Sequence, residues 1–240
     1  MGGSFDPVHV AHVALAETAL AHLQLDEVRW IPVGQAWQKQ RTLAAGEHRI
    51  AMVQAATAHE PRFTVDPIEV RRPGPSYTLD TVQALQQAQG VDAQWFLIMG
   101  QDQYANLTTW RDWPHLLARV TVAVACRGHD QPQPSAELAG HPHRVVTLPL
   151  SAQHVSSTEI RTRLGRGDDP LSLVPALVSL PVARYIANHQ LHAWHGDNFS
   201  SWYDDRSNTI RYFSSGCHKI SNSYYARNFG KCVFYDYIES

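Results

Sequence analysis

The chain has 240 residues, of which 44% are hydrophobic, and this length suits one medium α/β domain, with or without an appendage. Its formal net charge of -2 argues against nucleic acid or an acidic membrane as a partner. The three cysteines form no CxxC pair, which argues against a disulfide framework and predicts a cytoplasmic location. No apolar run approaches the ~20 residues that span a bilayer, and the first residues lack the features of a signal peptide.

Strand and helix signals alternate along residues 1–192. In chain order, the pattern predicts a helix over Ala11–Leu23, a strand over Val28–Val33, a helix over Glu47–Ala58, strands over Phe63–Val65 and Ile68–Val70, a helix over Leu79–Gln89, strands over Trp95–Met99, Val120–Ala125 and Val145–Leu148, and helices over Ser157–Leu164 and Val182–Asn188. Apolar strands that alternate with helices are typical of a parallel sheet covered on both faces. Such sheets bind ligands beyond the carboxyl ends of their strands, where the motifs below fall.

Residues 193–240 differ in composition from the residues before them. This stretch holds more than half of the chain's Trp, Tyr and Phe and two of its three lysines, and it shows little sustained apolar periodicity. We therefore predict a functional domain over residues 1–192 and a tail of separate character over residues 193–240.

The segment from Gly2 to His12 reads GGSFDPVHVAH and has the features of a phosphate site. Its two glycines permit a tight turn close to a ligand, and Asp6-Pro7 is a turn signal. His9 and His12 then share one face at the start of a helix, where free N–H groups and partial positive charge suit an anion. The alternative is a glycine turn with two surface histidines.

A second helix start lies at residues 155–161, which read VSSTEIR. Ser156 followed by Glu159 fits a capping box, so an ordinary helix start is one interpretation. Arg161 on the same helix is suited to a fork-like grip on phosphate oxygens, which favours a second phosphate site.

These two segments resemble the motifs GG(T/S)FDPxHxGH and (I/V)SST-x-(I/L)R of the nucleotidyltransferase superfamily. The first departs from its motif at Ala11, where the family usually has Gly; the added methyl removes no chemical group. The resemblance implies a Rossmann-like α/β fold, with a parallel sheet and helices on both faces. It also implies catalytic roles for His9, His12 and Arg161, and ATP binding by a larger set: Gly2, Gly3, Ser4, Phe5, Asp102, Ser156, Ser157 and Thr158.

Further strings resemble one family within this superfamily, the nicotinate-nucleotide adenylyltransferases. They are PGPSYTLDT at residues 73–81, GQD and LTTW at 100–102 and 107–110, and LVP and VARYI at 173–175 and 182–186. The resemblance spans residues 2–192 and implies transfer of the adenylyl group of ATP to nicotinate mononucleotide in NAD biosynthesis. The alternatives are nicotinamide mononucleotide or phosphopantetheine as acceptor, or a nucleotide-binding protein without turnover.

Four residues are expected to bind the acceptor. Trp110 can stack on the flat, electron-poor nicotinate ring, while Tyr77 and Thr78 can supply donors to its carboxylate. Lys39, the only lysine of residues 1–192, is a candidate phosphate contact. Asp102, just past a strand end, is expected to accept from ribose hydroxyls of ATP. The structural alternatives are a core or helix-cap aromatic for Trp110, a solvated loop lysine for Lys39 and a helix N-cap for Asp102.

The expected chemistry needs no general base, because the attacking 5′-phosphate is already anionic. Catalysis should come from positioning and charge stabilisation. Mg²⁺ is implied by ATP and should be held mainly by phosphates and water. The pairs His141/His143 and His192/His195 lack cysteine partners, so we predict no metal-binding residue. The sequence leaves the oligomeric state open.

The two ends of the chain depart from the family pattern. In the family a buried strand precedes the glycine pair, whereas Met1 alone precedes Gly2 here. We therefore expect the first strand to be missing, and the sheet to show a gap or a substituted segment beside Gly2–Phe5. The family usually ends near Leu191, so the tail is the second departure.

Overall fold

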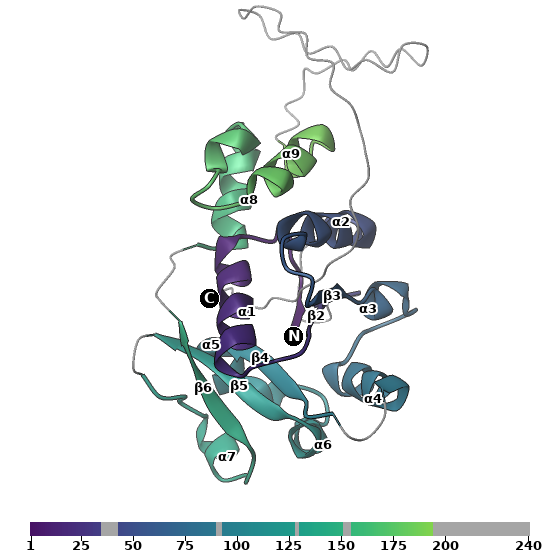
Figure 1. Cartoon of the computed structure of the whole chain (residues 1–240), viewed down its shortest axis with the longest axis vertical. Helices are drawn as coiled ribbons and strands as arrows, with labels where there is room; N and C mark the ends of the chain where they lie inside the picture. The colour runs from purple at the N-terminus through teal and green to yellow at the C-terminus, as the bar shows by residue number, and fades with distance from the viewer. Residues whose placement is uncertain (35–42, 90–92, 128–129, 151–154, 194–240) are drawn as a thin grey trace, which may run out of the picture.

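A computed structural model of the chain describes residues 1–34, 43–89, 93–127, 130–150 and 155–193. Parallel strands alternate with helices along these residues, which confirms the predicted α/β class (Figure 1). Apart from Ala193, the predicted tail lies outside the described residues, and so does Lys39.

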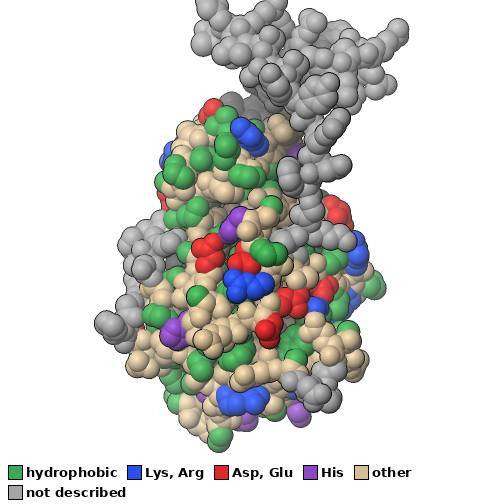
Figure 2. All heavy atoms as spheres, viewed as in Figure 1, with side chains coloured by type: hydrophobic (Ala, Val, Ile, Leu, Met, Phe, Trp, Pro, Cys, Tyr) green, Lys and Arg blue, Asp and Glu red, His purple; other side chains and the backbone are tan. Residues whose placement is uncertain are grey.

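On the face drawn in Figure 2, acidic, basic and histidine side chains lie close together near the middle of the view.

The elements follow one another in the order that the sequence predicts, with several short additions. The strands are β1 (Gly2–Gly3), β2 (Val28–Pro32), β3 (Phe63–Val65), β4 (Phe96–Gly100), β5 (Thr121–Arg127) and β6 (Val145–Leu150). The helices are α1 (Val10–His22), α2 (Gly46–Thr57), α3 (Ile68–Arg71), α4 (Thr78–Gln89), α5 (Gln101–Ala105), α6 (Trp113–Arg119), α7 (Ala136–Ala139), α8 (Ser157–Gly165) and α9 (Leu180–Asn188), with 3-10 turns η1 (Leu107–Thr109) and η2 (Pro170–Leu173). The predictions omit β1, α5, α6, α7 and both 3-10 turns.

The described strands form two parallel, three-stranded sheets in the orders β1-β2-β3 and β4-β5-β6. Placed end to end, these orders follow the 3-2-1-4-5-6 arrangement of a doubly wound fold. The first strand is reduced to the glycine pair itself: Gly2 and Gly3 form β1, which pairs with Ile31 and Pro32. Within the described part of the chain, no strand pairing joins β1 to β4, so the predicted break beside Gly2–Phe5 is present.

Helices cover both faces of the strands, as predicted. Along β4, Ile98 packs into a core shared with α1, α2, α8 and α9, while Leu97 packs into a second core shared with α4 and α6. Along β5, Ala123 joins the first core and Val122 the second. This period-two alternation makes the second sheet the boundary between two hydrophobic layers.

Residues Ile68–Val70 are helical, so the strand predicted there is wrong. They belong to α3, where the Asp66 carboxylate accepts from the Ile68 N–H at 3.0 Å and the Arg71 N–H donates to the Pro67 carbonyl at 2.9 Å. A short apolar run does not distinguish strand from helix by its periodicity. These local hydrogen bonds close a helical turn and decide the conformation.

Candidate active site

The glycine turn leads from β1 into α1 and is held by a buried aromatic ring. Phe5 has a φ of 46°, a left-handed conformation that is rare for a bulky side chain. Its fully buried ring packs against Trp30 and His12, with ring centroids 5.5 and 5.7 Å away. This packing holds the turn in its strained conformation, so the backbone of residues 2–5 follows one defined path to the helix.

The two predicted histidines lie at the start of α1, as expected. His9 is the N-cap residue, His12 lies in the first turn, and both are buried. The backbone N–H of His9 donates to Nδ1 of His12 at 2.7 Å, and the two rings stack with centroids 3.2 Å apart. Because Nδ1 of His12 accepts, a neutral His12 carries its proton on Nε2. Nε2 is therefore the atom through which His12 can donate to an anion.

The second predicted phosphate segment contacts the glycine turn directly. The buried Ser157 hydroxyl donates to the Pro7 carbonyl at 2.9 Å. The Arg161 guanidinium donates to the Asp6 carbonyl at 2.7 Å. These contacts join residues that are 150 and 155 positions apart, and they bring the N-terminal ends of α1 and α8 together. The structure thus unites the two segments that the phosphate hypothesis requires.

Ser156 and Thr158 flank this contact and are engaged by their own helix. Ser156 is the N-cap of α8, and its hydroxyl accepts from the Glu159 N–H at 3.1 Å. Thr158 accepts from the Arg161 guanidinium at 2.8 Å. Ser156 therefore caps α8, as the capping interpretation predicts.

A buried arginine braces the glycine turn from below. Arg49 of α2 is 3% exposed, and its guanidinium donates to the carbonyls of Ala44, Ser4 and Val33 at 2.8, 3.1 and 2.7 Å. Three carbonyl acceptors satisfy the donors of a cation that burial would otherwise penalise heavily. Arg49 therefore ties the turn to the end of β2 and to the segment that leads into α2.

The buried Asp6 carboxylate makes a second set of ties. Its Oδ1 accepts from the Ala44 N–H at 3.3 Å and lies 3.1 Å from Nε2 of His192. His192 follows α9 near the end of the described residues, so the carboxylate links the glycine turn to the segment before α2 and to the residues after α9.

Tyr77 lies beside the segment that follows Trp110. The Arg111 guanidinium lies 4.5 Å from the centre of the Tyr77 ring, within the range of a cation–π contact. Trp110 precedes Arg111 and packs, half-buried, against the second core. Thr78 follows Tyr77 and begins α4. Two strings that are distant in sequence are thereby brought together.

The end of β2 approaches two of the predicted segments. The Val33 N–H donates to the Gly3 carbonyl at 2.8 Å. The next residue, Gly34, approaches the acceptor segment so closely that a Cβ there would lie 3.0 Å from the Ser76 hydroxyl. The end of β2 therefore contacts both the glycine turn and the acceptor segment, and parallel sheets bind ligands at such strand ends.

Asp102 lies in the first turn of α5, directly after β4, and is exposed to solvent. The N-cap of that helix is Gly100, so the alternative of an N-cap role for Asp102 is wrong. The carboxylate remains at the carboxyl end of a parallel strand, as the ATP-binding hypothesis expects.

Comparison with known proteins agrees with this geometry. A family model described as cytidylyltransferase-like matches residues 1–163. A probable nicotinate-nucleotide adenylyltransferase from Methylibium petroleiphilum is 51% identical over 192 residues, which are 80% of this chain and 90% of that relative. The chain belongs to the nicotinate-nucleotide adenylyltransferase family. A relative of the same name from Bordetella petrii is 44% identical over 196 residues, covering 80% of this chain and 96% of its own length.

Solved structures show the same fold. Nicotinic acid mononucleotide adenylyltransferase from Plasmodium falciparum aligns with TM-scores of 0.62 in its complex with NaAD and 0.61 in its complex with APC. Each alignment covers 80% of this chain and 94% of the other, at 17% and 15% identity. The likeness confirms the Rossmann-like nucleotidyltransferase fold.

Sequence reasoning missed several residues that build the site in this member of the nicotinate-nucleotide adenylyltransferase family. From the sequence, Asp6 is interpreted only as part of a turn, and no role is predicted for Arg49. A signal for Arg49 was nevertheless present, because it occupies the apolar stripe of α2 with Met52, Val53 and Ala56. An arginine at such a position must find acceptors inside the protein.

No metal-binding group of three His, Cys, Asp or Glu side chains occurs within the described ranges of this family member. His143 is engaged at both ring nitrogens, since Nδ1 lies 2.7 Å from the His141 carbonyl and Nε2 lies 2.8 Å from the Tyr104 hydroxyl. His195 lies outside the described residues. Of the helices that the structure describes, none has the length and apolar character to cross a bilayer.

Proposed function

We infer that the chain transfers the adenylyl group of ATP to nicotinate mononucleotide, giving nicotinate adenine dinucleotide and pyrophosphate in NAD biosynthesis. The observation that carries this inference is the seating of α8 on the glycine turn through Ser157 and Arg161. It places two helix N-termini and two histidines at one site, which suits a polyphosphate. The family membership and the NaAD complex of the Plasmodium relative support the same acceptor.

The proposed reaction is an in-line displacement. An oxygen of the mononucleotide 5′-phosphate attacks the α-phosphorus of ATP, the bond to the bridging oxygen breaks, and pyrophosphate leaves with the electron pair. The positive ends of α1 and α8, Nε2–H of His12 and the Arg161 guanidinium stabilise the charge on the triphosphate in this scheme. Gly2, Gly3, Ser4 and Phe5 supply the turn that brings the backbone close to it. Preorganised donors of this kind act without a general base.

The acceptor binds, in this proposal, beside the end of β2. Trp110 stacks on the nicotinate ring, and Tyr77 and Thr78 supply donors to its carboxylate, with Lys39 as an additional phosphate contact. Asp102 accepts from ribose hydroxyls of ATP. The support is the Tyr77–Arg111 contact, which brings the string of Tyr77 and Thr78 beside the string that ends at Trp110.

Mg²⁺ and location complete the proposal. Mg²⁺ prefers phosphate and water oxygens to a cage built by protein. Because the described residues contain no cluster of three His, Cys, Asp or Glu side chains that could hold a metal ion, the triphosphate itself would hold Mg²⁺, and the ion would offset part of its charge. A cytoplasmic location is proposed from the buried free thiol of Cys126, which suits a reducing compartment.

The test is pyrophosphate release from ATP with nicotinate mononucleotide, nicotinamide mononucleotide or phosphopantetheine as acceptor. We expect the highest kcat/KM with nicotinate mononucleotide. Higher kcat/KM with another acceptor would contradict the substrate, and no release with any acceptor would contradict enzymatic function.

A variant of His12 tests the assigned charge stabilisation. His12→Asn keeps an acceptor near the Nδ1 position for the His9 N–H but removes the Nε2 donor. Losing one transition-state donor costs on the order of 10²–10³ in kcat. His59→Asn is the matched control, because His59 is half-exposed and pairs with Glu17 away from the turn. Equal kcat in the two variants would reject the role of His12.

A further inference from the structure

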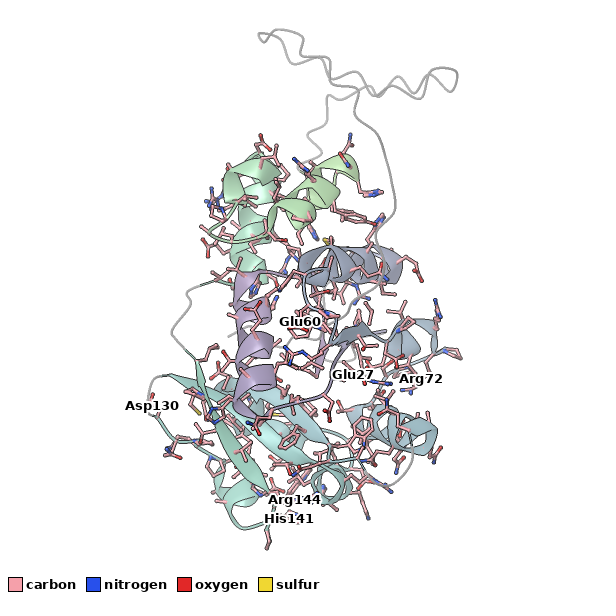
Figure 3. All side chains as sticks on the ribbon, in the orientation of Figure 1. Glu27, Glu60, Arg72, Asp130, His141 and Arg144 are labelled. Carbon is pink, nitrogen blue, oxygen red and sulfur yellow. The ribbon has the colours of Figure 1, made fainter. Side chains whose placement is uncertain are left out.

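A chain of buried polar groups underlies the acceptor segment at residues 73–78. The Arg72 guanidinium donates to Oγ1 of Thr81 at 2.9 Å, and the Thr81 hydroxyl donates to Oε1 of Glu69 at 2.8 Å. Glu69 is 7% exposed and Thr81 is 3% exposed. Figure 3 places Arg72 between α3 and α4, immediately before the acceptor segment. The chain of hydrogen bonds therefore spans the base of this segment from one end to the other.

Gly34 brings the end of β2 against the same groups. Its backbone N–H is hydrogen-bonded to the Glu69 carboxyl group. A Cβ at this position would lie 2.1 Å from the Glu69 carbonyl oxygen and 3.0 Å from the Ser76 hydroxyl. Only glycine fits such a close approach. Close contacts at Gly34 consequently join the strand end to α3 and to the acceptor segment.

The Glu69 carboxyl group lies in an unfavourable place for an acid. Burial raises its pKa, while the hydrogen bond from Thr81 and the charge of Arg72 act in the opposite direction. A buried acid costs folding free energy that an apolar residue would not cost. Stability therefore does not explain an acid at this position, whereas its place between the strand end and the acceptor segment points to a role in holding that segment.

We propose that Glu69 and Thr81 are positioning residues for the acceptor. They hold residues 73–78 against the end of β2, so that Tyr77 and Thr78 face the carboxylate of the pyridine ring. This inference rests on the proposed function, which assigns Tyr77 and Thr78 to the acceptor. The ATP segments are held by contacts of their own, through Arg49, Ser157 and Arg161, so we expect Glu69 and Thr81 to act mainly on acceptor binding.

The experiment compares substitutions that change one hydroxyl. Thr81→Val removes the link between Arg72 and Glu69 at nearly constant volume, and Thr81→Ser retains it. Thr57→Val is the matched control: Thr57 is fully buried in α2, and its hydroxyl donates to the Val53 carbonyl at 2.9 Å. Steady-state pyrophosphate release gives KM for nicotinate mononucleotide, KM for ATP and kcat, well below each melting temperature.

We expect Thr81→Val to raise the acceptor KM by about tenfold, equivalent to ~1.4 kcal/mol. Its KM for ATP should stay within about twofold, because the phosphate segments are held by other contacts. Thr81→Ser and Thr57→Val should both keep the acceptor KM within about twofold of wild type.

Trp110→Ala separates this inference from the proposed function. An acceptor KM that rises in Trp110→Ala but not in Thr81→Val would overturn the positioning role and leave the acceptor site intact. An acceptor KM unchanged in both would remove the acceptor assignment itself and the inference with it. A rise in Thr57→Val as large as that in Thr81→Val, or an equal rise in the KM for ATP, would show a general loss of structure and would also overturn the inference.

Discussion

Arg49 should contribute more to stability than any surface arginine of this protein. Replacing Arg49 with Met keeps an unbranched side chain in the apolar stripe of α2 but removes three hydrogen bonds to carbonyls. Hydrogen bonds that involve a charged group contribute about 1.5–3 kcal/mol each. Relief from burying the cation offsets part of that loss, so we expect a net destabilisation of ~3–5 kcal/mol.

The magnitude is measurable against the whole stability of the domain. A domain of this size is stabilised by about 5–15 kcal/mol. A change of 1 kcal/mol shifts the melting temperature of a 150–250-residue domain by about 2–4 °C. Arg49→Met should therefore melt roughly 6–20 °C below wild type by circular dichroism, with a matching loss in urea. Arg49→Lys keeps the charge without the fork and should fall in between.

Arg62→Met is the matched control for this prediction. The Arg62 side chain is 52% exposed and pairs with Glu60 at 2.7 Å. Solvent screens an ion pair at the surface, so the melting temperature of Arg62→Met should barely differ from that of wild type. If Arg49→Met melts within about 3 °C of wild type, or no lower than Arg62→Met, the buried fork does not brace the turn and the reasoning is refuted.

Three further predictions concern the turn, a buried acid and the sheet. Ser157→Ala should lose about 1–2 kcal/mol in urea unfolding, because the Pro7 carbonyl loses its donor; an unchanged midpoint would argue against the contact. Burial raises the folded-state pKa of Glu69, so its contribution to stability is present at acid pH and is lost as the pH rises above the usual range of an unfolded-state glutamate. The free energy of unfolding of Glu69→Gln should therefore rise relative to that of wild type between pH 5 and pH 7. Parallel plots of this free energy against pH for the two proteins would contradict the prediction. Fusing a short apolar strand before Met1 should raise the melting temperature by lengthening β1 against β2, and equal melting temperatures would count against it.

Local motifs in the sequence were sufficient for much of this protein. The alternation of strands and helices predicted the α/β class, and contiguous strings predicted the histidines at the start of α1 and the family. These features depend on neighbours in the chain, because helix caps, glycine turns and hydrophobic periodicity are properties of a few adjacent residues. Prediction failed where local signals were ambiguous, as at Ile68–Val70. There the hydrogen bond from the Ile68 N–H to Asp66 stabilises a helical turn instead of the predicted strand.

The contacts that assemble the site were decided by tertiary structure. Ser157 meets Pro7 across 150 positions, and no pattern within either segment specifies that pairing. Arg49 contradicts the apolar periodicity of its own helix, and it is tolerated because carbonyls from three separate segments converge on it. The same holds for Glu69, which is unremarkable in sequence and becomes informative through its burial beside Thr81. Buried polar groups require partners in three dimensions, and those partners come from wherever the chain returns to the same place.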